Sequence, residues 1–239
     1  MVLMTKKRQR VVSAFLGLVL LFAGAVTTTI KQEQHNAAIE KSKPPLVLSE
    51  HTGSAYQALT KLEVKGRAPK TGYAREQFGA GWADVGNCDM RNYILQRDMD
   101  NEQLDLNNNC TVLDGTLHDP YTGKTIAFNR GAGTSSAVQI DHVVALSDAW
   151  QKGAQSLDEG TRAEFANDPL NLLAVDGPTN NKKSDGDAAT WLPPNKNYRC
   201  RYVARQVAVK QKYKLWVTAA ERDAIAGVLR ACPNQTLPV

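Results

Sequence analysis

The amino-acid sequence predicts one α+β domain in which short β-hairpins are embedded among helices. Three observations support this fold class. Apolar residues recur at helical spacing in several segments, the first at residues 54–64. Two short runs rich in β-branched and other apolar residues, 138–144 and 171–175, are typical of strands. Residues 118–123, His-Asp-Pro-Tyr-Thr-Gly, form a turn sequence between two apolar segments, which indicates a hairpin.

The expected elements follow one another from residue 54 to the end of the chain. Helices are expected at 54–64, 89–99, 145–152, 161–167, 179–186, 198–214 and 218–231, and strands at 110–117, 124–128, 138–144 and 171–175. Capping boxes at Thr161-x-x-Glu164 and Thr218-x-x-Glu221 should open two of the helices. The segment 72–89 is rich in glycine and aromatic residues and should be irregular.

The composition is typical of a folded chain, and the net charge gives no support for a nucleic-acid partner. Of the 239 residues 42% are hydrophobic and 22% charged, which excludes a mainly disordered, collagen-like or polytopic membrane protein. The net charge of +5 is typical of nucleic-acid binders. Residues 1–25, however, carry four basic side chains and no acidic one, and the rest of the chain carries 25 basic and 24 acidic side chains. The global charge is therefore no evidence for a nucleic-acid partner.

The N-terminus has the pattern of an export signal. Basic residues at 6–10 precede an uncharged apolar run, and Ala23-Gly24-Ala25 matches a cleavage site. We expect residues 1–25 to be a signal peptide. The uncharged stretch continues to residue 30, so an uncleaved membrane anchor through residues 11–30 is the alternative. Both interpretations place the folded part outside the cytoplasm, either secreted or tethered to the outer face of the membrane.

A polar segment separates this signal from the folded domain. Residues 26–53 contain Pro44-Pro45 and show no sustained periodicity, and we expect a tether there, followed by one domain at 54–239. The domain contains four cysteines and no C-x-x-C pair: Cys88, Cys110, Cys200 and Cys232. In an exported chain this set favours two disulfides over a zinc site. Of the three pairings, the sequential one closes the shortest loops and is our prediction.

The candidate chemistry begins at Asp141-His142. This pair ends a β-branched run, whereas the other three histidines lie in the tether, at its edge or in a turn. Alternation along a strand would place the two side chains on opposite faces. If the strand ends at this point, both side chains can face one cleft. The alternative is a buried structural Asp–His pair.

Positive charge concentrates shortly after this region. Residues 178–239 carry a net charge of +7, and residues 196–214 contain seven basic residues without an acidic one. A solvated helix face is the simple interpretation of such a run. The alternative is a surface that binds phosphate groups without reading bases. The residues expected to do so are Arg201, Arg205, Lys210 and Lys212.

Three separate segments resemble the HNH endonuclease motif. They are Asp141-His142-Val143-Val144-Ala145-Leu146, Asn171-Leu172-Leu173 and Asn180-Asn181-Lys182-Lys183-Ser184-Asp185. The chain is most similar to the branch that shares its domain with the C-terminal part of GmrSD-type restriction enzymes. Within that branch it resembles exported, disulfide-containing bacterial proteins, which have similar Asp-Pro-Tyr-Thr-Gly and Trp-Leu-Pro-Pro segments. The resemblance covers roughly residues 86–230. It implies a ββα-metal (His-Me finger) motif, two short strands and a helix around one divalent ion.

The resemblance also implies an activity and roles for its residues. It implies a metal-dependent endonuclease that hydrolyses phosphodiester bonds of DNA, with RNA left open as substrate. His142 would be the general base. Asp141 and Asn180 would bind one Mg²⁺ or Mn²⁺ through hard oxygen atoms, with Asn181 as the alternative to Asn180. Asn171 would hold the loop and orient His142 by hydrogen bonding.

Two further expectations come from the same resemblance. Lys183 would contact phosphate. The 28 residues between His142 and Asn171 form a longer insertion than in compact HNH motifs, and we expect it to fold outward between the two strands.

Two other classes of function compete with the nuclease interpretation. The first is a non-catalytic binding protein for nucleic acid or cell-envelope polymer on an HNH scaffold. The presence of Asp141, His142 and Asn180 argues against it, because binding alone needs no base beside a metal site. The second, a serine hydrolase at residues 134–136, lacks the G-x-S-x-G elbow. Nothing in the sequence indicates an obligate protein partner.

Overall fold

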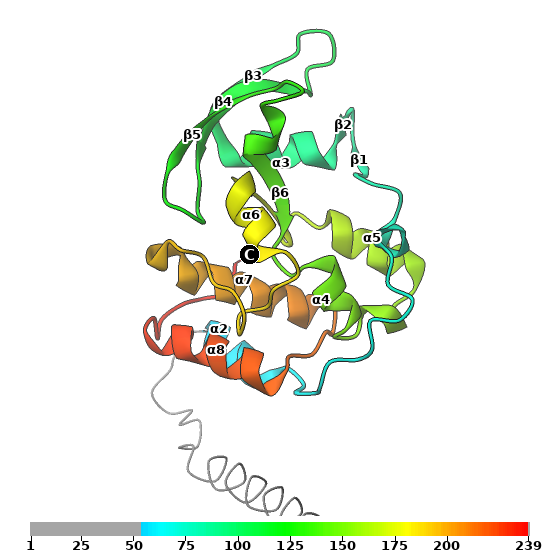
Figure 1. Cartoon of the computed structure of the whole chain (residues 1–239), viewed down its shortest axis with the longest axis vertical. Helices are drawn as coiled ribbons and strands as arrows, with labels where there is room; N and C mark the ends of the chain where they lie inside the picture. Colours follow the sequence, from blue (N-terminus) through cyan, green and yellow to red (C-terminus); the bar gives the residue numbers. More distant parts are fainter. Residues whose placement is uncertain (1–53, 239) are drawn as a thin grey trace, which may run out of the picture. The chain divides into compact units, whose positions relative to one another are not determined.

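Seven helices and three small antiparallel sheets form the part of the chain that the computed structural model describes, residues 54–238 (Figure 1). The helices are α2 (Ser54–Lys61), α3 (Met90–Asp98), α4 (Leu146–Trp150), α5 (Glu159–Asn167), α6 (Gly177–Lys183), α7 (Arg199–Lys212) and α8 (Ala219–Arg230). The predicted α+β class is confirmed. The expected signal peptide or anchor and the expected tether lie outside the described residues.

The strands are short and pair mostly with their neighbours in sequence. They are β1 (Asp84–Val85), β2 (Cys88–Asp89), β3 (Met99–Leu104), β4 (Val112–His118), β5 (Thr125–Asn129), β6 (Val138–His142) and β7 (Leu172–Asp176). The strand order is β1-β2, β3-β4-β5 and β6-β7. The predicted hairpin is β4–β5. Strand β3 was not predicted, because its sequence, Met-Asp-Asn-Glu-Gln-Leu, is polar and carries no alternating pattern.

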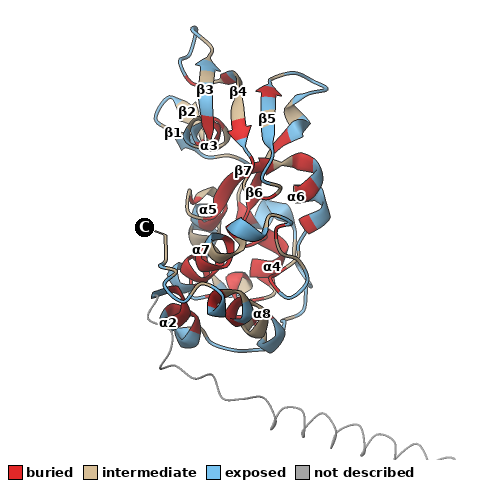
Figure 2. Cartoon of the chain, turned by 90° about the vertical axis from the view of Figure 1, so that its left-hand side faces the viewer, coloured by how far each residue is buried: buried red, intermediate tan, exposed pale blue. Residues whose placement is uncertain are grey.

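The β6–β7 hairpin lies at the centre of the molecule and is buried along most of its length, as Figure 2 shows. Successive side chains of β7 enter different cores. Leu172 and Ala174 pack with α3 and the three-stranded sheet, whereas Leu173 and Val175 pack with the core around α2, α7 and α8. Both faces of β7 are covered, and its first four residues are all apolar. The side chains at the ends of these two strands are therefore attached to a backbone that is packed on both sides.

The insertion between β6 and β7 is part of a core and does not fold outward. All five residues of α4 are buried, and Trp150 packs edge-to-face against Phe78 and Tyr73. Phe165 of α5 joins the same cluster and packs against Tyr213 near the end of α7. The expectation of an outward insertion is wrong, because its apolar side chains close a third core against α7.

One predicted helix start is confirmed and one is wrong. At α8, the Thr218 side chain accepts from the Glu221 amide, and the Glu221 side chain accepts from the Thr218 amide, which is a complete capping box. Helix α5 begins two residues before Thr161, because Asp158 caps it instead. The Asp158 carboxylate accepts from both the amide and the hydroxyl of Thr161. Thr161 therefore lies inside the first turn of α5 and is not its cap.

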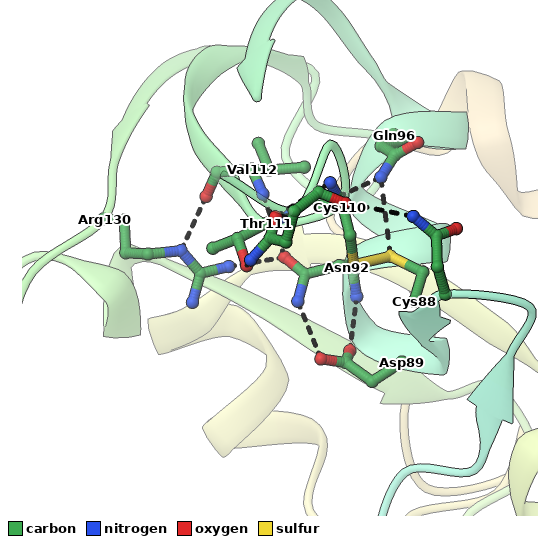
Figure 3. The surroundings of a disulfide bond; sticks show 10 residues. Cys88, Asp89, Asn92, Gln96, Cys110, Thr111, Val112 and Arg130 are labelled. Atoms are coloured by element: carbon green, nitrogen blue, oxygen red, sulfur yellow. Dashed lines mark hydrogen bonds between the residues drawn. A yellow bond between two sulfur atoms is a disulfide. The ribbon is translucent and has the colours of Figure 1, made fainter. Parts of the chain in front are cut away.

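Both disulfides have the predicted sequential pairing. Cys88–Cys110 joins β2 to the segment before β4, and Cys200–Cys232 joins α7 to the segment after α8. Around the first bridge, the Gln96 amide donates to the Cys110 carbonyl oxygen at 2.7 Å (Figure 3). No helix among the described residues is long and apolar enough to span a membrane.

Candidate active site

A polar cleft of about 600 Å³ opens beside β6 and α6. Its lining includes three cationic side chains, two aromatic rings, the end of β6 and one face of α6: Lys70, Arg75, Arg91, Tyr73, Trp82, Gln139, Asp141, His142, Asn180 and Asn181. Helix α6 begins directly after β7, and Figure 1 shows it beside β6. A Cβ atom at Gly177 would lie 2.0 Å from the Ser136 carbonyl oxygen, so only glycine permits this close approach.

His142 is held at the end of β6 with one ring nitrogen engaged. Its Nε2 lies 2.8 Å from the carbonyl oxygen of Ala166. A carbonyl oxygen can only accept, so Nε2 carries the proton and Nδ1 of the neutral ring keeps its lone pair. Burial, assisted by the nearby charges of Arg75 and Lys183, lowers the pKa of His142 to about 3. The ring is therefore neutral at neutral pH and able to accept a proton.

Asn171 holds the backbone that follows β6, as expected. Its side-chain oxygen accepts from the Val144 amide at 2.9 Å, and its amide donates to the Val144 and Phe165 carbonyl oxygens. The residue is completely buried. The hydrogen bond that orients His142, however, is the one that its Nε2 donates to the carbonyl oxygen of Ala166, next to Phe165. Among the described residues, Asn171 makes no side-chain hydrogen bond to the His142 ring and contacts only the neighbouring backbone.

Asp141 is buried and both of its oxygen atoms have partners. Oδ1 accepts from Nζ of Lys183 at 2.8 Å, and Oδ2 accepts from the hydroxyl of Tyr121. Burial raises the pKa of Asp141, whereas the ammonium and the hydroxyl both lower it. Lys183 also donates to the His142 carbonyl oxygen at 2.8 Å. The carboxylate therefore belongs to an ion pair in the wall of the cleft.

This ion pair corrects the expectation for Lys183. The side chain is completely buried, and its ammonium is engaged by Asp141 and by the backbone of His142. A lysine that contacts phosphate keeps its ammonium accessible. The prediction that Lys183 contacts phosphate is wrong, because its charge compensates a buried carboxylate.

Asn180 reaches the cleft from α6. Its side-chain nitrogen donates to Oε1 of Gln139 at 2.9 Å, and its side-chain oxygen, Oδ1, has no partner among the hydrogen bonds of the described residues. Asn181 also lines the cleft and is exposed. The described residues contain no group of three or more His, Cys, Asp or Glu side chains placed to hold a metal. The fold thus brings Asp141, His142 and Asn180 together, but they contain a single carboxylate.

The four α7 residues that were predicted to bind phosphate do not form one surface, and none lines this cleft. Lys210 is completely buried and pairs with Glu221 at 3.0 Å, so the prediction that it grips phosphate is wrong. Lys212 is half-exposed and pairs with Asp168 at 2.8 Å. Arg201 and Arg205 line a different cleft. The helix faces three environments, because its residues point in different directions around the axis.

The cations and rings of the cleft were not predicted from the sequence. Lys70, Tyr73, Arg75 and Trp82 come from the irregular segment before α3, and Arg91 comes from the start of α3. Aromatic and basic residues are interspersed in that segment, and this composition is the feature of the sequence that could have indicated a nucleic-acid-binding cleft. No apolar periodicity marks the residues before α3, since that segment contains no α-helix or long strand after Lys61.

The fold and the cleft define an α+β protein whose central hairpin presents a neutral histidine to a cation-lined cleft. A family model, the C-terminal domain of GmrSD restriction endonucleases, matches residues 89–228, and the chain belongs to this family. A protein of Arthroderma benhamiae named as an uncharacterized secreted protein is 37% identical over 191 residues, which are 79% of this chain and 89% of that protein. That relative is fungal, whereas the resemblance had suggested bacterial proteins. No solved structure matches the chain.

Proposed function

We propose that this chain is an exported HNH-type endonuclease that hydrolyses phosphodiester bonds of DNA, with RNA as the alternative substrate. The observation that carries the proposal is the state of His142. One ring nitrogen is fixed by Ala166, and the ring borders a cleft that also contains Lys70, Arg75 and Arg91. A neutral imidazole beside three cations suits deprotonation of water next to a phosphodiester.

The cleft can supply two parts of this reaction from its own residues. The cations would bind the phosphate and balance the negative charge that increases in the transition state. His142 would accept the proton of the attacking water through Nδ1. A pKa of about 3 makes the imidazole a weak base in the empty cleft. A bound phosphate adds negative charge nearby and would raise the pKa of His142 toward the range useful for general-base catalysis.

The arrangement of β6, β7 and α6 supports the ββα-metal assignment. Two antiparallel strands followed directly by a helix place Asp141 and Asn180 on one cleft. Each carboxylate oxygen of Asp141 has one protein donor, which leaves further lone pairs, and the side-chain oxygen of Asn180 is unengaged among the described residues. Such oxygens fit Mg²⁺ or Mn²⁺, which commonly bind one or two protein groups together with water and substrate phosphate. When bound, the ion would neutralise charge on the phosphate and the leaving oxygen.

The test is a plasmid-nicking assay with the purified, disulfide-bonded protein. EDTA should abolish nicking, and added Mg²⁺ or Mn²⁺ should restore it. The H142A variant should lose at least about 10²-fold, the lower scale of general-base catalysis. The matched control is S136A, an exposed residue outside the cleft, which should retain full activity.

Three results would contradict the proposal. Nicking that persists in EDTA would show that cleavage needs no metal ion. Full activity in H142A would show that His142 is not the general base. DNA binding without any cleavage under all metal conditions would favour the non-catalytic binding protein.

Export is a part of the proposal with its own test. A secreted relative and two disulfides support it. N-terminal sequencing of protein from the culture medium should find a start near residue 26 if residues 1–25 are cleaved. Recovery of the intact chain from membranes would instead indicate the anchor through residues 11–30.

A further inference from the structure

A second cleft, of about 530 Å³, lies against β7 and the first turns of α7. Three arginines line it, and we name it the arginine cleft after Arg97, Arg201 and Arg205. It shares no lining residue with the cleft around His142. Both clefts are nevertheless lined by the β6–β7 hairpin. Leu173 of β7 lines the arginine cleft, and its partner in the strand pairing, Asp141 of β6, lines the cleft of His142.

Two of the guanidinium groups converge on one acceptor. Arg97 Nη2 and Arg205 Nη1 donate to the carbonyl oxygen of Leu172, at 2.7 and 3.3 Å. These two nitrogens therefore lie within about 6 Å of each other, a distance at which like charges repel. Holding two cations so close is unfavourable unless negative charge is nearby.

The carboxylates of this cleft do not provide enough of that charge. The Asp98 carboxylate accepts two hydrogen bonds from the Arg97 guanidinium, at 2.6 and 2.8 Å, and one from the Ala174 amide. Asp119 is buried and accepts from backbone amides and from the Thr122 hydroxyl. Among residues 54–238, no ion pair includes Arg205 or Arg201. The cleft thus holds two guanidinium groups without a carboxylate partner.

The third arginine is oriented by an aromatic ring. The guanidinium of Arg201 lies 5.2 Å from the ring centroid of Tyr198, which is itself buried. Stacking on an aromatic face restricts a long side chain while leaving its donors free. Arg201 and Arg205 are one helical turn apart on α7, so their side chains project toward the same face.

We propose that the arginine cleft binds a backbone phosphate of the polynucleotide substrate at a distance from the scissile bond. The identity of this ligand rests on the proposed function, whereas the anion site rests on the arginines themselves. Guanidinium groups bind phosphate oxygens through two parallel hydrogen bonds and carry no base preference in this role. The two clefts are lined by paired strands of the same hairpin, and a polymer extending beyond the cleft of His142 is proposed to reach the arginine cleft.

The experiment measures binding and chemistry separately. Binding to a duplex of about 30 base pairs, roughly three helical turns, is followed by fluorescence anisotropy in EDTA over a range of salt concentrations. Chemistry is followed with bis(p-nitrophenyl) phosphate, a phosphodiester too small to span both clefts. The variants are R201Q/R205Q and, as a matched control with the same charge loss, K61Q/R230Q at two exposed positions outside both clefts.

R201Q/R205Q should weaken duplex binding about tenfold and reduce the salt slope by about 0.9 for each DNA phosphate that the variant no longer neutralises. Its hydrolysis of the small phosphodiester should equal that of the unaltered protein. The charge-preserving R201K/R205K variant should recover only part of the affinity, because lysine lacks the bidentate geometry.

Equal affinities and salt slopes for R201Q/R205Q and K61Q/R230Q would overturn the proposal. A protein that cleaves nothing but shows the expected change in salt slope would refute the proposed function and leave this site intact.

Discussion

The indole of Trp82 stacks on the imidazole of His142, with ring centroids 5.8 Å apart and planes inclined by 8°. Trp82 lies seven residues before the start of the family match, at residue 89. The candidate base is therefore covered by a side chain from outside the matched domain. Hydrogen bonding by Ala166 and stacking by Trp82 together restrict the ring.

Removing this stack should change the titration of the histidine. In W82A, water reaches the ring, so the pKa of His142 should rise from its lowered value toward the ordinary one. NMR titration of the His142 ring protons, assigned with H142A, measures the shift. W82F preserves an aromatic face and should titrate nearly as the unaltered protein does. An identical pKa in W82A would show that the indole does not exclude water from the ring.

Because Asp141 and Lys183 form a buried ion pair, the effects of replacing them on the free energy of unfolding should not be additive in a double-mutant cycle. K183M leaves the Asp141 carboxylate buried without its cation and should lower the free energy of unfolding by about 3–5 kcal/mol. D141N/K183M removes both charges and should be clearly more stable than K183M alone. Urea unfolding of D141N, K183M and the double variant gives the coupling. Additive effects would mean that the two groups do not interact, against the 2.8 Å separation of Lys183 Nζ and Asp141 Oδ1.

Stability should fall with acid because of His142. Its pKa is lowered in the folded state to about 3 from an ordinary value of 6.5, so the unfolded chain binds the proton first as the pH decreases. The stability that the neutral buried ring contributes is complete above pH 6.5 and is lost progressively from there down to about pH 3. Urea unfolding of H142Q should show a shallower loss over this window. Parallel pH dependence in both proteins would contradict the shift.

The two adjacent asparagines of α6 should differ in metal binding. N180A removes the unengaged carbonyl oxygen and should weaken Mn²⁺ binding, whereas N181A should bind nearly as the unaltered protein does. Electron paramagnetic resonance of Mn²⁺, with an uncleavable phosphorothioate oligonucleotide present, measures both. The reverse order would assign Asn181 as the ligand.

Local patterns in the sequence predicted most of the regular elements. The β4–β5 hairpin and the capping box of α8 depend on residues close to one another in the chain, and each disulfide joins two cysteines that follow one another in the sequence. Strand β3 was missed for the opposite reason, because its polar sequence pairs only when β4 is present beside it. The start of α5 was misplaced because Asp158 and Thr161 can both serve as caps, and their competition is decided by three-dimensional geometry.

For the candidate site, the sequence by itself determined which residues surround the central hairpin: Asp141 and His142 end β6, and Asn180 follows β7 on the next helix. Only the tertiary structure decided what each basic side chain does. Lys183 meets a carboxylate 42 residues away, and Lys210 meets one 62 residues away. Basic residues look alike in a sequence. A buried carboxylate needs a nearby cation, and which lysine supplies it depends on contacts between distant segments.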